Sequence, residues 1–168
     1  MPIYLEQVDI SHQLKEFASV LIVFCPICPV ISLSMQKHSA CLELSKRGFK
    51  SVAFQDHIRS IREPLEDVGI KTDLFTSYMP CPTMCLWTRG QRERLRNRAG
   101  DYEAAVVLGC DTARYTARQA LQDTNCQVIP AMRMTGLTNA IVKFRFPMTV
   151  TLEENTRVAG GGNVSKVP

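Results

Sequence analysis

The sequence predicts an α/β fold of three layers, in which a mostly parallel, open sheet of about five strands carries helices on both faces. Three observations support this fold class. Short apolar runs rich in β-branched residues recur along the chain, segments of helical pattern separate them, and a length of 168 residues suits a single core. Strands that alternate with helices are typical of parallel sheets, because each crossover helix covers one face of the sheet.

The strand signals differ in strength along the chain. Ala18–Phe24 and Ala104–Leu108 are continuous apolar runs, as expected for strands that are buried on both faces. The other segments predicted as extended are, in chain order, Ser51–Phe54, Asp73–Tyr78, Gln127–Ile129 and, as an edge strand or an arm, Ile141–Leu152.

Helices are predicted between these strands. Pro29 suits the first turn of a helix and Gly48 suits its stop, so one helix is expected to run to about Arg47. The alternation resembles that of flavodoxin-like and Rossmann-like folds. The other helical segments are Ser11–Phe17, Ile58–Val68 with an interruption at Pro64, an arginine-rich helix that ends near Gly100, and Thr112–Asp123.

The domain prediction is a single α/β domain over residues 1–152, followed by a C-terminal tail over residues 153–168 that serves as an interaction arm. The tail contains the linker-like run Gly160–Gly162. The first residues lack a basic stretch followed by an apolar one, so we expect a cytoplasmic protein. The most apolar segment, Val20–Leu33, is too short to span a membrane and contains two prolines.

Five of the seven cysteines follow predicted strands. The number is odd and nothing indicates export, so a framework of structural disulfides is not expected. Cys41 and Cys126 fall inside a predicted helix and at the start of a predicted strand, where we expect core packing. The loops after parallel strands emerge at one edge of a sheet, which is where such sheets bind ligands. The cysteines predicted to gather at that edge are Cys25, Cys28, Cys81, Cys85 and Cys110.

Our first interpretation of this arrangement is an iron–sulfur or other metal centre. Cys25, Cys28, Cys81 and Cys85 are the predicted ligands, because four thiolates are standard for iron–sulfur clusters. The cofactor site is further predicted to include Cys110 as a substitute ligand, the glycine before it, Gly109, and His57 at the end of the second predicted strand. The protein would then serve as a subunit of a larger complex, in electron transfer or in cofactor assembly or delivery. A structural zinc site ranks lower, because zinc sites usually stabilise small or loop-rich folds, whereas a full α/β core folds without one.

Two alternatives remain open. Cys25-Pro26-Ile27-Cys28 locally resembles a glutaredoxin-type active site, although the resemblance covers little of the chain. It implies a thiol–disulfide oxidoreductase or a persulfide carrier, in which Cys25 or Cys28 attacks. The other alternative is a non-catalytic assembly subunit whose cysteines are merely buried.

A run of arginines after Cys85 is the candidate partner surface. Arginine suits carboxylates and phosphates, so Arg89, Arg92 and Arg96 are predicted to dock an acidic protein partner or an anionic cofactor tail. The C-terminal tail is a second candidate contact, either with such a partner or with another copy of the chain. A net charge of +4 and few aromatic residues near the run argue against nucleic acid as a partner, and no membrane partner is expected.

Overall fold

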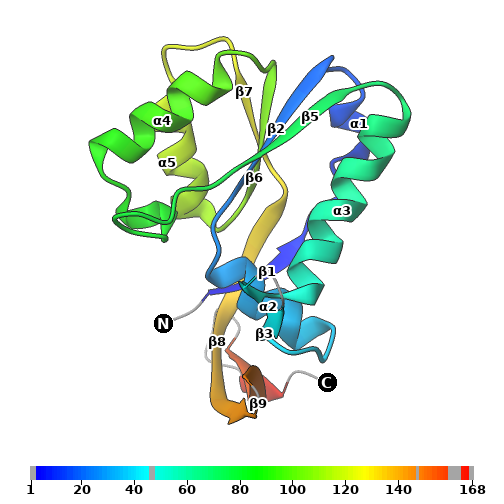
Figure 1. Ribbon diagram of the computed structural model, residues 1–168, viewed down its shortest axis with the longest axis vertical. Helices are drawn as coiled ribbons and strands as arrows, with labels where there is room; N and C mark the ends of the chain where they lie inside the picture. The colour runs from blue at the N-terminus through cyan, green and yellow to red at the C-terminus, as the bar shows by residue number, and fades with distance from the viewer. Residues whose placement is uncertain (1–2, 46–47, 147, 159–163, 167–168) are drawn as a thin grey trace. The chain divides into compact units, whose positions relative to one another are not determined.

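A computed structural model of the chain describes residues 3–45, 48–146, 148–158 and 164–166. The chain forms an α/β structure with two sheets, and its residues divide into two compact units. Because one stretch of unit 1 interrupts unit 2, the chain passes between the units several times (Figure 1). Unit 1 comprises Met1–Glu6, Ile27–Arg59 and Met134–Pro168, and unit 2 comprises Gln7–Pro26 and Ser60–Arg133.

Unit 2 is built on a parallel sheet of four strands in the order β5-β2-β6-β7. The two central strands, β2 and β6, are apolar, and every residue of β6 is buried, as expected for strands that are covered on both faces. The four strands are β2 (Ser19–Phe24), β5 (Lys71–Phe75), β6 (Ala104–Leu108) and β7 (Gln127–Pro130).

The strand order places a topological switch point between β2 and β6. The strand that follows β2 in this sheet, β5, lies on one side of the pair, whereas β7, which follows β6, lies on the other. The carboxyl ends of strands at such a point are where open α/β sheets bind ligands. Cys25 and Gly109 are the first residues beyond these two strands. The amide of Cys25 donates to the carbonyl oxygen of Leu108 over 3.0 Å, which extends the ladder by one more bond.

Helices cover both faces of this sheet (Figure 1). On one face, α4 (Arg89–Ala99) packs against α5 (Asp111–Leu121), and the short 3₁₀ turn η1 (Met84–Leu86) packs against α5. The other face carries α1 (Ser11–Leu14) and the second half of α3 (Val52–Asp67). In the described part of the chain, no helix is both long enough and apolar enough to cross a membrane.

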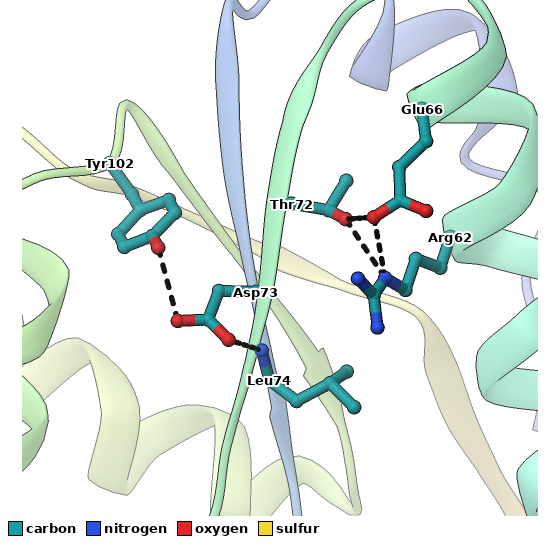
Figure 2. A network of polar contacts seen from close by, with 6 residues as sticks. All are labelled: Arg62, Glu66, Thr72, Asp73, Leu74 and Tyr102. Atoms are coloured by element: carbon teal, nitrogen blue, oxygen red, sulfur yellow. Dashed lines mark hydrogen bonds and ion pairs between the residues drawn. The ribbon is translucent and has the colours of Figure 1, made fainter.

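Strand β5 forms an edge of the parallel sheet, and its polar side chains project to both sides. Figure 2 shows Thr72 and Asp73 on opposite sides of the strand. Thr72 Oγ1 donates to Glu66 Oε1 over 2.6 Å, and Arg62 Nε donates to the same oxygen over 2.6 Å. Asp73 accepts a hydrogen bond from the hydroxyl of Tyr102 over 3.2 Å. Polar and charged side chains along an edge strand oppose pairing with another chain.

Unit 1 holds the second sheet, in the order β1-β8-β9-β3-β4, with β10 also paired to β9. Strand β9 pairs antiparallel with β8, β3 and β10. Gly136 allows the close approach of β8 and β9, because a Cβ atom at that position would lie 2.6 Å from the carbonyl oxygen of Val158. The strands are β1 (Ile3–Gln7), β3 (Leu42–Ser45), β4 (Gly48–Lys50), β8 (Met132–Arg145), β9 (Thr149–Val158) and β10 (Val164–Lys166).

Helix α2 (Cys28–Gln36) is fastened to β1, which is an edge strand of this second sheet. Ser32 Oγ accepts from the amide of Leu5 over 3.0 Å and donates to the carbonyl oxygen of Ile3 over 3.1 Å. Gln36 Nε2 donates to the carbonyl oxygen of Leu5 over 2.7 Å. These bonds satisfy backbone groups that an edge strand otherwise leaves without a partner strand.

The prediction of one sheet of about five strands is wrong. Four of the predicted strands do form the parallel sheet, but the segment Ser51–Phe54 does not belong to it. Instead it leads into α3, where Ala53 and Phe54 are buried. Aromatic and β-branched residues pack as well on a buried helix face as in a strand, so the local pattern did not decide between the two. The segment Ile141–Leu152 contributes to β8 and β9 of the second sheet.

The predicted helix Ser11–Phe17 ends earlier, at Leu14, and Thr112–Asp123 is shifted to Asp111–Leu121, while two other predicted helices differ more. The helix expected to reach Arg47 ends at Gln36, two residues before His38 adopts a φ of 47°, and the chain then continues into β3. Residues 46–47 lie outside the described part of the chain. The helix expected over Ile58–Val68 starts earlier, as α3, and Pro64 lies within it without ending it.

The segment predicted as a tail, residues 153–168, contributes strand residues to unit 1. Residues up to Val158 belong to β9, and β10 pairs with that strand. Residues 159–163 and 167–168, which include the glycine run, lie outside the described part of the chain.

Gly109→Ala is expected to lower the free energy of unfolding by about 1–3 kcal/mol. The new Cβ would lie 2.6 Å from the Cβ of Ala113, which is fixed to α5, so the helix must move. Chemical denaturation measures this loss. Gly100→Ala is the control, because the nearest atom to its new Cβ is the carbonyl oxygen of Asn97 at 3.6 Å. Equal stability of the two variants would contradict the expectation.

Candidate functional site

Four of the five cysteines predicted for the site belong to unit 2, and they follow three neighbouring strands. Cys25 follows β2, Cys81 and Cys85 follow β5, and Cys110 follows β6. Because β5 and β6 flank β2 on its two sides, the three loops leave from adjacent positions along one edge of the sheet. Cys28 is the first residue of α2 and belongs to unit 1.

The thiols of this edge differ in exposure. Cys25 and Cys110 are buried, with 5% and 7% of their surface exposed, whereas Cys81 is half-buried and Cys85 is exposed. All seven cysteines lie in the described part of the chain, and none of them forms a disulfide. The edge therefore combines two buried thiols at the switch point with two accessible ones beside it.

The loop that carries Cys81 is held mainly by one buried amide side chain, that of Gln91. Gln91 is fully buried at the start of α4, and its Nε2 donates to the carbonyl oxygen of Cys81 over 2.7 Å. The same nitrogen donates to the carbonyl oxygen of Ser77 over 3.3 Å and to its hydroxyl over 3.2 Å. Gln91 also forms a capping box with Thr88, in which each side chain accepts from the other's amide. One residue thus fixes both the start of α4 and the loop.

Further contacts fix the same loop at both ends. Thr76 Oγ1 donates to the carbonyl oxygen of Phe24 over 2.9 Å, which ties the loop to the end of β2. Arg94 Nη2 donates to the carbonyl oxygen of Met79 over 2.8 Å. The Cys81 Sγ lies 3.0 Å from Thr83 Oγ1 in a hydrogen bond. The position of the Cys81 thiol is therefore determined by several bonds within unit 2.

Gly109 and Cys110 lie where α5 approaches the sheet most closely. Cys110 is the N-cap residue of α5, and its side chain makes no capping hydrogen bond. The space on the side-chain side of Gly109 is occupied by Ala113, and the Cβ of Cys25 lies 3.6 Å from an ideal Cβ at Gly109. The close packing of Ala113 therefore accounts for a glycine at this position. Its predicted place beside a bound cofactor stays a prediction.

His57 does not follow a strand, because the strand predicted before it is part of a helix. It lies in α3, within the part that belongs to unit 1, and only 6% of its surface is exposed. Burial, with a smaller contribution from the positive charge of Lys37, lowers the pKa of His57 to about 4. Its imidazole is therefore neutral at neutral pH.

No group of three or more cysteine, histidine or acidic side chains is arranged to hold a metal ion within the described residues. The neighbouring strands bring the cysteine-bearing loops to one edge but do not by themselves bring the sulfur atoms to ligand distance. The predicted metal ligands Cys25, Cys28, Cys81 and Cys85 stay predictions.

The arginine-rich run forms α4, and two of its three predicted docking residues fasten that helix to its surroundings. Arg92 donates to the carbonyl oxygen of Trp87 over 3.3 Å and to Gln119 Oε1 over 2.6 Å. Arg96 donates to the carbonyl oxygen of Ala120 over 3.0 Å. Arg89, at the first position of α4, is exposed. Docking of a partner by these arginines stays a prediction.

Sequence reasoning missed three residues that line this part of unit 2. Gln91 is one of them, and the spacing Thr88-x-x-Gln91 matches the capping-box pattern that could have revealed it. The others are Trp87 and Arg114, whose Nε1 and Nε atoms are buried with no hydrogen-bond partner among the described residues. No sequence pattern signals such buried donors, because their burial depends on tertiary packing.

Cys41 and Cys126, which we predicted to be core residues, are both buried. Burial raises the pKa of the Cys41 thiol and raises the pKa of Cys126 to about 11. Both thiols stay protonated at neutral pH, which suits packing rather than nucleophilic attack.

Comparisons of the chain with protein-family models, with curated proteins and with solved structures found no significant match.

Gln91→Leu is expected to lower the free energy of unfolding by about 1–3 kcal/mol, because the carbonyl oxygens of Ser77 and Cys81 lose their donor. Alkylation of Cys81, followed by mass spectrometry, should also become faster as the loop loosens. Gln122→Leu, at an exposed position after α5, serves as the control. An unchanged alkylation rate at Cys81 would show that Gln91 does not hold the loop.

The low pKa of His57 predicts a loss of stability in mild acid. The unfolded chain takes up a proton near pH 6.5, whereas the folded chain does so only near pH 4. The stabilisation is complete above pH 6.5 and declines as the pH falls toward 4, by about 2 kcal/mol at pH 5. Urea denaturation at pH 7.5 and 5.0 should show that His57→Gln loses less stability between these two pH values than the wild-type protein does. The full loss should persist in His12→Gln, an exposed histidine on α1; equal losses in both variants would contradict the assignment.

Proposed function

We propose that the carboxyl edge of the parallel sheet in unit 2 is a thiolate site for an iron–sulfur or related metal centre. The protein would act as a subunit for electron transfer, or for assembly or delivery of a cofactor, within a larger complex. The proposed ligands within unit 2 are Cys25, Cys81, Cys85 and Cys110.

The observation that carries this proposal is that all four thiols follow three adjacent parallel strands at a switch point. Cysteines scattered for packing alone would fall equally on strand bodies and helix interiors. Iron–sulfur clusters favour thiolate ligands, and four are standard. The hydrogen bonds from Cys25 to Leu108 and from Thr76 to Phe24 further tie the three strand ends to one another.

Because no group of three or more metal-binding side chains is arranged to hold a metal among the described residues, metal binding would have to rearrange the cysteine-bearing loops. The cost is a rearrangement of the loop that Gln91 and Arg94 hold, at about 1 kcal/mol for each hydrogen bond lost. A structural thiolate site for zinc supplies about 10–16 kcal/mol. A thiolate site of that strength would exceed the cost of moving one loop.

A second candidate function is thiol–disulfide or persulfide chemistry. Cys85 favours it because its side chain is exposed and it lies four residues from the half-buried Cys81 on the same loop. Two thiols that approach each other suffice for this chemistry, whereas a cluster needs a larger set. The motif Cys25-Pro26-Ile27-Cys28 runs across the boundary between the two units. Its part in such chemistry stays a prediction from the sequence.

Anaerobic reconstitution with iron and sulfide tests the first candidate. The protein should bind iron and acid-labile sulfide in equal amounts and gain visible absorption. Serine at Cys25, Cys81, Cys85 or Cys110 should each remove most of the bound iron, because each substitution deletes one thiolate. Cys126→Ser is the control, since that residue directly precedes β7, at the opposite edge of the sheet. Cys28→Ser shows whether unit 1 supplies a ligand.

Three results would contradict the iron–sulfur proposal. They are a colourless protein without iron after reconstitution, retention of iron by all four serine variants, and stoichiometric zinc without sulfide. A metal-free protein in which Cys85 forms a mixed disulfide with glutathione, trapped by Cys81→Ser, would support the second candidate instead.

A further inference from the structure

An exposed face of unit 2 combines apolar side chains with arginines directly beside the exposed Cys85. Leu86, the neighbour of Cys85 in η1, is 69% exposed, and Tyr115, on α5, is 61% exposed. The turn η1 packs against α5, so these two side chains belong to contacting elements. Large exposed apolar side chains beside arginine are typical of protein–protein interfaces.

A chain of hydrogen bonds fixes the arrangement of this face. Arg92 Nε donates to the carbonyl oxygen of Trp87, the residue after Leu86, and Arg92 Nη1 donates to Gln119 Oε1 over 2.6 Å. Gln119 Nε2 in turn donates to the hydroxyl of Tyr115 over 3.2 Å. The end of η1, the first turns of α4 and the middle of α5 are thus joined into one surface. Because the side chains of Arg92 and Tyr115 are held before any partner arrives, these two residues lose little side-chain entropy on binding.

The charge of this face is positive and largely uncompensated. Within the described part of the chain, the acceptors of Arg92 are neutral, a carbonyl and an amide oxygen. Arg89 at the start of α4 and Arg118 near the end of α5 are exposed, and neither makes an ion pair among the described residues. The same two helices also carry the acidic Glu93 and Asp111, which reduce the excess of positive charge but do not remove it.

We propose that this surface, formed by Leu86, Arg89, Arg92, Tyr115 and Arg118, is the docking site for an acidic protein partner. The uncompensated arginines select a partner with carboxylates, and Leu86 and Tyr115 supply the apolar centre. Because Cys85 adjoins Leu86, a partner bound here reaches the thiol edge of the sheet. This inference deepens the proposed function and rests on it in one respect. Only the proposed function identifies the partner as the protein that exchanges electrons or a cofactor with the thiol edge.

The proposal is tested by the binding of an acidic peptide to the 168-residue chain. The peptide has 16 residues, in which Glu and Asp alternate with Leu and Tyr. Titration followed by amide chemical shifts should locate the peptide on η1, α4 and α5. Arg89→Glu should weaken binding about tenfold at low salt. This variant should fold normally, because a negative charge suits the first turn of a helix. Tyr115→Ala should weaken binding as well, through loss of the apolar contact.

The control for the charge change is Lys15→Glu, which reverses an exposed charge elsewhere in unit 2 and should leave binding unchanged. A peptide with Lys at all acidic positions should not bind. The proposal fails if neither peptide binds, if both bind equally, if Arg89→Glu binds as tightly as the wild type, or if a 16-nucleotide single-stranded DNA binds more tightly than the acidic peptide.

A further variant separates this inference from the proposed function. Cys85→Ser removes a proposed metal ligand but keeps the docking surface, so it should bind the acidic peptide with wild-type affinity even without metal. Loss of peptide binding in that variant would show that the surface depends on the thiol site, which contradicts the inference. Failure of iron reconstitution with intact peptide binding would overturn only the metal centre.

Discussion

The pairing of β2 with β6 is the constraint on which the rest of unit 2 depends. Both strands are buried on two faces, and the central residues Val20–Val23 are fully excluded from solvent. A charged side chain within these two buried strands would carry a large desolvation cost. Reactive groups are therefore restricted to the strand ends. The chain places Cys25 and Gly109 immediately after the last paired residues, where the ladder still holds the backbone through the bond from Cys25 to Leu108.

The two sides of this pair position thiols in different ways. On the β6 side, Cys110 is fixed by packing, because Gly109 lets Ala113 approach the strand end and α5 starts at once. On the β5 side, a longer loop carries Cys81 and Cys85, and hydrogen bonds from Gln91 and Arg94 hold it. A residue that is fixed by packing against a helix can move only if the whole helix moves, whereas a loop that is held by a few hydrogen bonds can exchange them locally. If the thiols gather around a ligand, the loop after β5 is the part that moves.

The sequence predicted most of the parallel sheet and less of the second sheet, for a physical reason. Ala104–Leu108 was identified with its observed bounds, because a strand buried on both faces needs an unbroken apolar run. The antiparallel strands β8 and β9 are consecutive in the chain and pair with each other, but their other neighbours in the sheet, β1 and β3, lie far away in the sequence. The local pattern therefore does not reveal the second sheet. The placement of cysteines after strands was likewise predictable from topology. Their mutual distances were not, because loop bonds such as Gln91 to Cys81 determine them.

The arginines of α4 show how one charged run can serve two purposes. Arg94 and Arg96 bind backbone carbonyls at the Cys81 loop and at the end of α5, and Arg98 pairs with Asp73 on the edge strand β5. A guanidinium group suits this work because it presents several donors in a fixed plane. These residues explain why the helix is stable despite having little apolar surface. Among the described residues, neither Arg89 nor Arg118 on α5 makes such an intramolecular hydrogen bond or ion pair. The charge that remains for a partner is therefore not that of the whole run but that of Arg89 and Arg118, together with Arg92, whose acceptors within the fold are neutral.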